Sequence, residues 1–400
     1  MTPVQTGLMH LLDDPPRWIR KARLGLLCNP AAIDHRYRHA REVIARRFPG
    51  QLAALYAPQH GFFAEKQDNM VESGHMTDPL SGLPVFSLYG ETRRPTADML
   101  APIDILLVDL QDVGTRVYTF LTTLSYCMEA AASLDKQVVV LDRPNPVDGV
   151  TLEGNLLQPE CASFVGRFPI PMRHGLTIAE AAVLFNTTFG IGAELDVVPM
   201  RGWRRTMRFE ETGLPWVPPS PNLPTPAAAL VYPGQVIWEG TNVSEGRGTT
   251  LPFEQFGAPF VDTPSLLASL DPQFTAGVIL RPVTFQPTAN KWRDTPCHGF
   301  HIHVTDPSLF RSYPLSLELL RAIFKCHRDD FRWQPPPYEY EFDRMPIDLI
   351  LGDPAVRGAI EGGTPVSALV ADWQHDLNAY GEQHRAVALY PFPDRMASRG

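Results

Sequence analysis

The strongest constraint on the fold is a near-continuous apolar run at residues 103–110, with the sequence IDILLVDL. A strand with one face in water alternates apolar and polar residues, whereas a strand covered on both faces of a parallel sheet is apolar almost throughout. The run ends in the polar residues Gln111-Asp112-Val113-Gly114. It therefore predicts a buried strand of an open, mostly parallel sheet.

The first half of the chain alternates between strand-like and helical patterns. The predicted strands are 24–28, 52–57, 103–110, 137–141 and 195–199. The predicted helices are 36–47, 120–134 and 177–189. Thr177 and Glu180 have the spacing of a capping box at the start of the last helix. This alternation predicts an α/β fold with a Rossmann-like, mostly parallel sheet.

A proline-rich segment at 214–226, LPWVPPSPNLPTP, divides the chain. Its six prolines are incompatible with a helix or a central strand, so it is expected to be a stiff connection. The Rossmann-like domain is accordingly predicted at 1–228. A smaller α+β domain is predicted at 229–400, with the active-site cleft between the two. The second domain shows strand patterns at 277–280 and 300–304, and helical patterns near 266, at 316–325 and beyond 353.

Polar residues follow three of the predicted strands, at 58–62 (PQHGF), 109–120 (DLQDVGTRVYTF) and 141–146 (LDRPNP). Ligands of open parallel sheets bind at the carboxyl ends of the strands. Three polar strand ends in succession therefore predict one common crevice.

The segment 232–259, YPGQVIWEGTNVSEGRGTTLPFEQFGAP, is the second candidate site feature. It contains three acids, an amide, a guanidinium and five glycines, and is not expected to form a regular helix. A connecting loop does not need this density of hydrogen-bonding side chains. The segment is predicted to be an active-site loop for a polyhydroxylated or anionic small molecule.

Composition excludes several classes of protein. The net charge of −9 and the absence of a Lys/Arg run argue against a general nucleic-acid binder. No apolar run approaches the roughly 18–20 residues that span a bilayer. The N-terminus lacks the basic and apolar pattern of a secretory signal. Five scattered cysteines without C-x-x-C spacing indicate reduced thiols, so a cytoplasmic location is expected.

Several catalytic classes lack their motifs. No G-x-G-x-x-G follows a strand, and neither a P-loop nor a G-x-S-x-G elbow occurs. His298, His301 and His303 in CHGFHIHV are the only candidate metal ligands with suggestive spacing. They lack nearby acidic partners, so half-buried strand histidines are the favoured interpretation and no metal is predicted.

Carboxylate chemistry remains as the favoured interpretation. Hydrolysis of a glycosidic bond needs an acid at the leaving oxygen and a second carboxylate as base or nucleophile. Three aromatic residues, Phe62, Tyr118 and Trp238, could stack on sugar faces or belong to the core. The candidate acids near the predicted crevice are Glu65, Glu72, Asp112, Asp142, Glu239 and Glu245.

Together these segments resemble the NamZ-type exo-β-N-acetylmuramidases, a family long catalogued as a domain of unknown function. The similar stretches are PQHGF, 81–90, 109–120, 141–149, 163–180, 218–225 and 232–259. The resemblance covers most of the chain, in the family's order. It implies a Rossmann-like domain beside a C-terminal domain, and release of N-acetylmuramic acid (MurNAc) from non-reducing ends of peptidoglycan fragments without a cofactor.

The chain departs from the family at the first motif. That motif usually reads P-E-H-G-F, whereas this chain has Gln59. If the family glutamate is the proton donor, this protein is either inactive or uses another acid. Glu72, in DNMVES, matches a second family glutamate. It is the predicted general acid, with Asp112 or Glu245 as its partner.

The remaining polar residues of these segments are predicted to bind substrate. They are Gln59, His60, Gln111, Arg116, Tyr118, Arg143, Asn145, His174, Glu239, Asn242 and Arg247. The lactyl carboxylate of MurNAc would suit one of the arginines. The chain is thus expected to be a cytoplasmic glycosidase of cell-wall recycling that acts on a small amino-sugar or muropeptide substrate. A carbohydrate-binding protein without turnover, or a metal-dependent hydrolase, are the alternatives.

Overall fold

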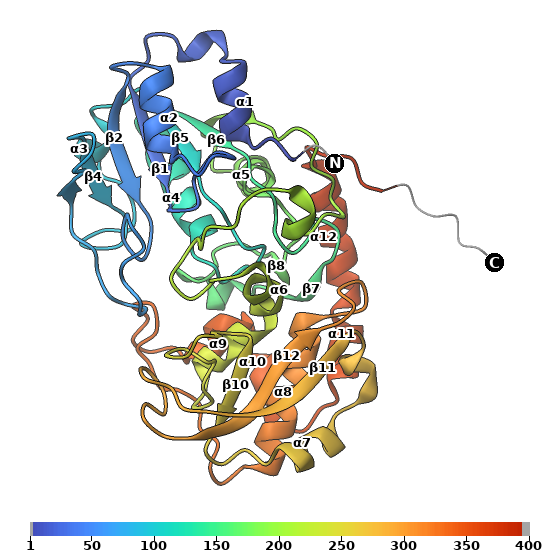
Figure 1. Ribbon diagram of the computed structural model, residues 1–400. Coiled ribbons are helices and arrows are strands. Elements are labelled where there is room, and N and C mark those ends of the chain that lie inside the picture. Colours follow the sequence, from blue (N-terminus) through green and yellow to red (C-terminus); the bar gives the residue numbers. More distant parts are fainter. Residues whose placement is uncertain (1–2, 394–400) are drawn as a thin grey trace.

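The structure is a computed structural model that describes residues 3–393 (Figure 1). A seven-stranded sheet forms the upper part of the molecule in this view. Its strand order is β3-β4-β2-β1-β5-β6-β9, and all neighbours run parallel except the edge pair β3 and β4. The strands are β1 (Leu24–Cys28), β2 (Leu52–Ala57), β3 (Met76–Thr77), β4 (Pro84–Ser87), β5 (Ile105–Asp109), β6 (Gln137–Leu141) and β9 (Glu194–Val198).

The central strands are buried on both faces, as the apolar run at 103–110 predicts. Leu106 and Val108 of β5 belong to one core cluster, whereas Ile105 and Leu107 belong to the cluster on the opposite face. Successive side chains of a strand point to opposite faces, so each face needs its own layer of helices. The α/β fold class is therefore confirmed.

Helices cover both faces of this sheet. On one face lie α1 (Gly7–Asp13) and α2 (Ala40–Arg47), and on the other α4 (Phe120–Ala132) and α5 (Ile178–Thr187). The predicted capping box is confirmed, because Thr177 accepts from the Glu180 amide while the Glu180 carboxylate accepts from the Thr177 amide. The short elements of this half are α3 (Ala97–Leu100), β7 (Glu153–Leu156), β8 (Pro171–Arg173), η1 (Arg17–Ile19), η2 (Pro159–Cys161) and η3 (Phe209–Thr212).

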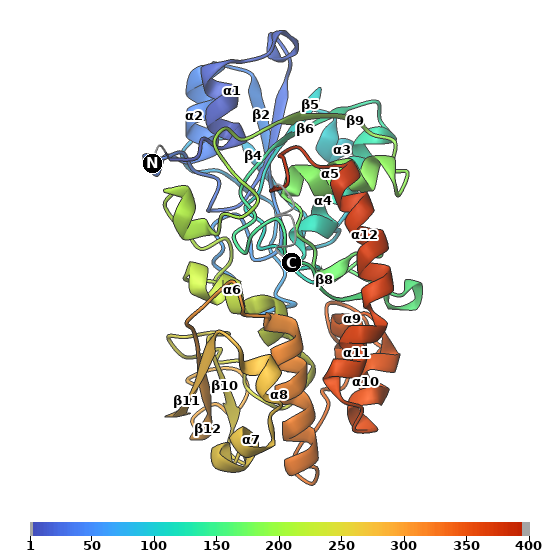
Figure 2. The ribbon, with the colours of Figure 1, turned by 90° about the vertical axis from the view of Figure 1, so that its right-hand side faces the viewer.

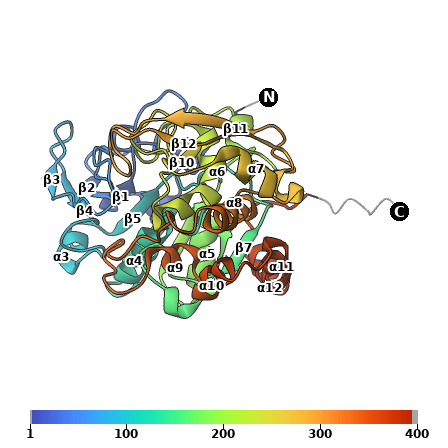
Figure 3. The ribbon, with the colours of Figure 1, turned by 90° about the horizontal axis from the view of Figure 1, so that it is seen from below.

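A smaller antiparallel sheet lies in the lower part of the molecule, seen from below in Figure 3. Its order is β10 (Gln255–Ala258), β12 (Cys297–Val304), β11 (Val278–Phe285). The strand predicted at 300–304 is therefore confirmed as part of a longer strand, and so is that at 277–280 except for Gly277, which lies in the turn before β11. Its accompanying helices are α6 (Pro226–Gln235), α7 (Thr263–Ser269), α8 (Ser312–Cys326), α9 (Pro346–Leu351), α10 (Pro354–Glu361) and α11 (Val366–Asp372), with η4 (Val236–Gly240) and η5 (Pro272–Thr275).

The segment 232–259 is more regular than predicted at its two ends. Tyr232–Gln235 forms the last turn of α6, and β10 begins at Gln255. Pro233 has no N–H to donate to the carbonyl four residues earlier, and the Gly234 amide after it donates to the Ser312 hydroxyl instead. The prediction that this segment forms no regular helix is therefore wrong for its first four residues. The residues between η4 and β10 form the predicted irregular loop.

The two regions are in contact along one core. A single hydrophobic cluster includes Val108 of the large sheet as well as Phe256 and Phe300 of the small one. The last helix, α12 (Gln374–Ala386), returns to the first region, as Figure 2 shows in red. Division of the chain into domains 1–228 and 229–400 stays a proposal, and the extreme ends of these ranges lie outside the described residues. Across residues 3–393, no helix is long and apolar enough to cross a membrane.

Candidate active site

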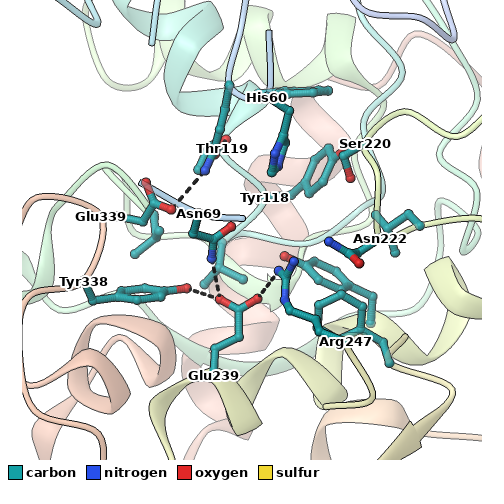
Figure 4. Close-up of a pocket in the computed structure, with 17 residues that line it drawn as sticks. His60, Asn69, Tyr118, Thr119, Ser220, Asn222, Glu239, Arg247, Tyr338 and Glu339 are labelled. Atoms are coloured by element: carbon teal, nitrogen blue, oxygen red, sulfur yellow. Dashed lines mark hydrogen bonds and ion pairs between the residues drawn. The ribbon is translucent and has the colours of Figure 1, made fainter. Parts of the chain in front are cut away.

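One pocket joins the carboxyl ends of the large sheet to the glycine-rich loop (Figure 4). The segments after β2 and β5 contribute to it, as does the proline-rich connection at 214–226. The predicted common crevice therefore receives two of the three polar strand ends, because 141–146 does not line it. The lining residues are Gln59, His60, Asn69, Val117, Tyr118, Thr119, Phe120, Val165, Ser220, Asn222, Leu223, Tyr232, Glu239, Arg247, Phe253, Tyr338 and Glu339.

Glu239 presents a carboxylate at the floor of this pocket as drawn in Figure 4. Its Oε2 accepts from the Tyr338 hydroxyl at 2.6 Å and from Asn69 Nδ2 at 3.1 Å. Its Oε1 forms an ion pair with the Arg247 guanidinium at 2.6 Å. Three donors from separate segments thus fix the orientation of this carboxylate.

Arg247 also forms an ion pair with Glu245, an acid outside the pocket lining. Its Nε lies 3.2 Å from Glu245, whose other oxygen is 2.9 Å from Lys291 Nζ. Burial opposes the charge of Glu245, but Lys291 and Arg247 outweigh it and lower the pKa of that carboxyl. Glu245 is therefore an ionised structural partner that keeps Arg247 in place.

Glu339 is the second acid of the pocket, and its side chain is almost completely buried, with 4% of the residue exposed. Its Oε1 accepts from Gln59 Nε2 at 2.9 Å and its Oε2 from the Tyr89 hydroxyl at 2.5 Å. Burial raises the pKa of Glu339 to about 7, although both hydrogen bonds oppose the shift. The two pocket acids therefore differ in environment: one is ion-paired and the other is held between neutral donors.

The side-chain amide of Gln59 connects Thr119 to Glu339 and Tyr89. Its Oε1 accepts from the Thr119 hydroxyl at 2.6 Å, so its Nε2 is the atom that faces Glu339 and Tyr89. A donor is thereby directed at Glu339 from the strand end that follows β2.

Three residues that line the pocket have a strained backbone conformation. His60, Phe253 and Glu339 all have positive φ angles, of 76°, 63° and 46°. Such conformations are unfavourable for residues with a Cβ and often occur at functional sites. Burial also lowers the pKa of His60 to about 4, so its imidazole is neutral near pH 7.

Comparison with protein families matches the chain in two consecutive parts. Residues 24–227 match the N-terminal domain of the exo-β-N-acetylmuramidase NamZ, and residues 230–390 match its C-terminal domain. The chain is also 40% identical over 387 residues to the peptidoglycan β-N-acetylmuramidase NamZ of Bacillus subtilis strain 168. That alignment covers 97% of this chain and 91% of the relative.

The chain belongs to the NamZ exo-β-N-acetylmuramidase family.

Two crystal structures of DUF1343 family proteins from Bacteroides fragilis NCTC 9343 share the fold. One superposes with a TM-score of 0.85 at 31% sequence identity, over 98% of this chain and 100% of the other. The second has a TM-score of 0.75 at 27% identity, with the same coverage. The resemblance seen in the sequence motifs is thus confirmed over the whole fold.

Five of the predicted substrate-binding residues line the pocket of this NamZ family member: Gln59, His60, Tyr118, Glu239 and Arg247. Tyr118 is buried, and its hydroxyl faces Ser220 but makes no hydrogen bond of regular geometry among residues 3–393. A buried hydroxyl without a partner is uncommon and marks a position where a ligand group can bind.

The other six predicted binding residues are engaged elsewhere in the described part of the chain. Arg143 pairs with Asp109 at 2.5 Å, and Arg116 donates to four backbone carbonyls. Because these arginines already have buried partners, they are not placed to meet a sugar carboxylate. The remaining four, Gln111, Asn145, His174 and Asn242, bond to backbone atoms outside the pocket.

None of the three predicted catalytic acids belongs to the pocket lining. Glu72 is exposed and accepts from the Tyr340 hydroxyl at 3.3 Å. Asp112 accepts from the Gly114 amide at 2.7 Å and lies 3.5 Å from His174, while ionised Glu245 is paired with Lys291 and Arg247 outside the pocket lining. Their catalytic roles remain predictions, and the geometry favours the two lining acids instead.

Sequence reasoning missed Tyr338 and Glu339. They lie in the run PPPYEYEFDR between α8 and α9, where a carboxylate stands between two tyrosines directly after prolines. That combination resembles the polar and aromatic content of the loop at 232–259 and was the available signal. It has no periodicity, so it indicates a loop without indicating which site the loop meets.

Two of the three candidate histidines of β12 contact Arg281, and His298 contacts the Thr284 hydroxyl. Arg281 Nε donates to His303 Nε2 at 3.0 Å, and Arg281 also contacts His301 Nδ1 at 3.0 Å. Residues 3–393 contain no group of three or more His, Cys, Asp or Glu side chains arranged to hold a metal ion.

Proposed function

We propose that this protein is a glycoside hydrolase that releases MurNAc from the non-reducing end of peptidoglycan-derived fragments such as the disaccharide MurNAc-GlcNAc. Membership of the NamZ family across almost the whole chain supports this activity. The observation that carries it is the pocket itself, in which two carboxyl groups, Glu239 and Glu339, lie in unequal environments.

Glycosidic bond cleavage passes through an oxocarbenium-like transition state that needs one protonated and one ionised carboxyl group. Glu239 carries the ionised role, because its ion pair with Arg247 stabilises the carboxylate. It either activates water or stabilises the positive charge that develops at the anomeric carbon. The separation of the acting carboxyl groups from the bound sugar decides between inversion and retention.

The pocket also suits the lactyl group that distinguishes MurNAc from other amino sugars. Arg247 is the single Lys or Arg residue of the described pocket lining. One of its terminal nitrogens, Nη1, has only a long contact, of 3.5 Å, with the carbonyl oxygen of Gln67. An N–H group of the guanidinium is therefore available to the lactyl carboxylate. Asn222 and Ser220 supply neutral donors beside it.

The substrate is a small soluble sugar fragment, and the setting is cell-wall recycling in the cytoplasm. All five cysteines are free, and four of them are buried, which supports a reducing compartment. No cofactor is required for this chemistry.

Gln59 supports one alternative function, a carbohydrate-binding protein that does not turn over its ligand. The family motif usually has an acid at this position, and an amide cannot donate a proton to a leaving group. The two functions share the pocket and predict the same ligand. They differ only in whether free MurNAc appears.

The test compares two disaccharides of opposite order, MurNAc-GlcNAc and GlcNAc-MurNAc, with the purified protein and a metal chelator. Free MurNAc from the first substrate alone is expected. Binding of MurNAc-GlcNAc without product would establish the binding protein instead. Loss of activity with chelator, restored by Zn²⁺, would favour a metal-dependent hydrolase.

A further inference from the structure

Glu339 is buried in the pocket and accepts hydrogen bonds from Gln59 and Tyr89. It comes from the segment between α8 and α9, 280 residues away from its partner Gln59 in the chain. Tyr338 hydrogen-bonds Glu239, and the next residue, Glu339, is the second acid. Two consecutive residues therefore fix the relative position of both carboxyl groups in the pocket.

We propose that Glu339 is the proton donor to the leaving sugar and that Gln59 and Tyr89 are its positioning residues. This inference rests on the proposed glycosidase function. Gln59 and Tyr89 each hold one oxygen of the Glu339 carboxyl group, which fixes the plane of the group. Each oxygen has a further lone pair, so the carboxyl group can still bond to a sugar.

The electrostatic surroundings keep a proton on this group. Glu339 is buried, its hydrogen-bond partners are neutral, and the negative charge of Glu239 further raises its pKa. Arg93, which stacks on the Tyr340 ring at 3.6 Å, opposes this effect. Burial has the largest effect and brings the pKa to about 7, which suits a general acid near neutral pH.

The step balances without any further reactant. The bond between the anomeric carbon of MurNAc and the bridging oxygen breaks, and its electron pair stays on that oxygen. The oxygen takes the proton of Glu339 and leaves as the hydroxyl of GlcNAc. Water supplies the hydroxyl that the anomeric carbon gains, and the second proton of water returns to the carboxyl groups of the site.

The decisive experiment compares two substrates whose leaving groups differ in their need for a proton. MurNAc-GlcNAc has a sugar alcohol as leaving group, whereas the 4-nitrophenyl β-glycoside of MurNAc releases a stable phenolate. Glu339→Gln keeps the shape of the side chain and removes its acidic proton. We expect this variant to lose about 10²–10⁴-fold in kcat on the disaccharide and less than about 10-fold on the aryl glycoside.

The pH profile gives a second readout that a structural role would not change. Wild-type activity on the disaccharide should fall as the pH rises through about 7, because Glu339 then loses its proton. That basic limb should be absent from the aryl glycoside reaction. Glu382→Gln on the exposed face of α12 makes the same chemical change far from the pocket and serves as the control.

Three results would overturn the inference. If the folded Glu339→Gln variant cleaves the disaccharide at the rate of the wild type, another group donates the proton. Equal losses on both substrates would show that Glu339 acts on something other than the leaving group. If the wild type cleaves neither substrate, the proposed function itself fails, and the role of Glu339 falls with it.

Discussion

At the scale of single residues, the pocket combines side chains from segments that are far apart in sequence. Glu239, Asn69 and Tyr338 meet through two hydrogen bonds, and Gln59 reaches Glu339. Each of these groups is buried or partly buried, so each contact is shielded from water and is stronger than it would be on the surface. Single substitutions that preserve volume should therefore have measurable effects on catalysis.

Tyr118→Phe tests whether the unpartnered hydroxyl meets the substrate. The free protein loses only a weak contact with Ser220 and no hydrogen bond of regular geometry, so its free energy of unfolding should fall by less than about 1 kcal/mol. The complex should lose one hydrogen bond of about 1 kcal/mol, which raises KM about five-fold. Steady-state kinetics and chemical denaturation measure the two quantities. A loss of stability with an unchanged KM would show that the hydroxyl serves the fold alone.

Gln59→Glu tests the pairing with Glu339. The variant brings a second carboxyl group to the oxygen that now accepts from the amide. Two carboxylates at hydrogen-bond distance repel each other, so the pair keeps a proton to higher pH than Glu339 does alone. The basic limb of the kcat profile, expected near pH 7 in the wild type, should move to higher pH. If the basic limb stays at the same pH, the ionisation that limits kcat is not that of Glu339.

Three of the five predicted binding residues that line the pocket lie in motifs that follow strands, and Glu239 and Arg247 lie in the predicted active-site loop. Gln59 and His60 follow β2, and the parallel-sheet rule alone directs them to the pocket. Glu339 follows no strand and has no periodic neighbours, so only the tertiary fold shows that it meets Gln59. Arg116 shows the opposite error. It was predicted to bind substrate because it lies in a polar motif, but its guanidinium donates to four backbone carbonyls.

At the scale of elements, the segment that follows helix α12 is bound to the first region of the fold by Tyr390. Beyond it, the Tyr390 hydroxyl donates to Asp142 at 2.5 Å and accepts from the Met200 amide at 2.8 Å. Both partners are buried in the first region of the fold. This residue therefore links the end of the chain to the carboxyl end of β6.

Tyr390→Phe should cost about 1–3 kcal/mol of unfolding free energy, because it leaves a buried amide and a buried carboxyl without their partner. Equilibrium denaturation in urea measures the change. Activity per folded molecule should be unchanged, since Tyr390 is outside the pocket lining. A stability equal to that of the wild type would mean that the segment around Tyr390 does not stay bound in solution.

The regular elements were predictable where local signals were strong. The bounds of β1, β2 and β6 agree with the predicted ranges, because each is a short apolar run closed by a polar turn. The end of α6 was missed, since Pro233 and Gly234 favour turns in sequence although the packing against Ser312 holds them in a helix. The return of α12 depends on tertiary contacts that leave no local pattern.

At the scale of the whole molecule, Arg116 connects the two regions. It lies in the segment after β5, and its guanidinium donates to the carbonyls of Ile350 and Leu351 at the end of α9, at 3.1 and 2.8 Å. The approach is so close that a Cβ on Gly352 would lie 2.5 Å from the guanidinium. Glycine is required there by space as well as by its φ of 74°.

Arg116→Met should therefore destabilise the whole protein. The change leaves four buried carbonyl groups without their charged donor, which should cost about 3 kcal/mol or more. Because one core cluster spans both regions, unfolding should remain a single transition. Arg23→Met, which breaks an exposed ion pair with Asp104, is the control and should leave the free energy of unfolding almost unchanged. Two separate transitions in the Arg116 variant would contradict a shared core.

The most direct test of the whole account is the rate at which free MurNAc appears from MurNAc-GlcNAc with the wild type and with Glu239→Gln. The variant removes the ion-paired carboxylate and keeps the side-chain volume. We predict release by the wild type, and a loss of about 10³-fold or more in kcat for the folded variant. Release by the variant at the wild-type rate, or no release by the wild type, would contradict the assignment of this pocket as a muramidase active site.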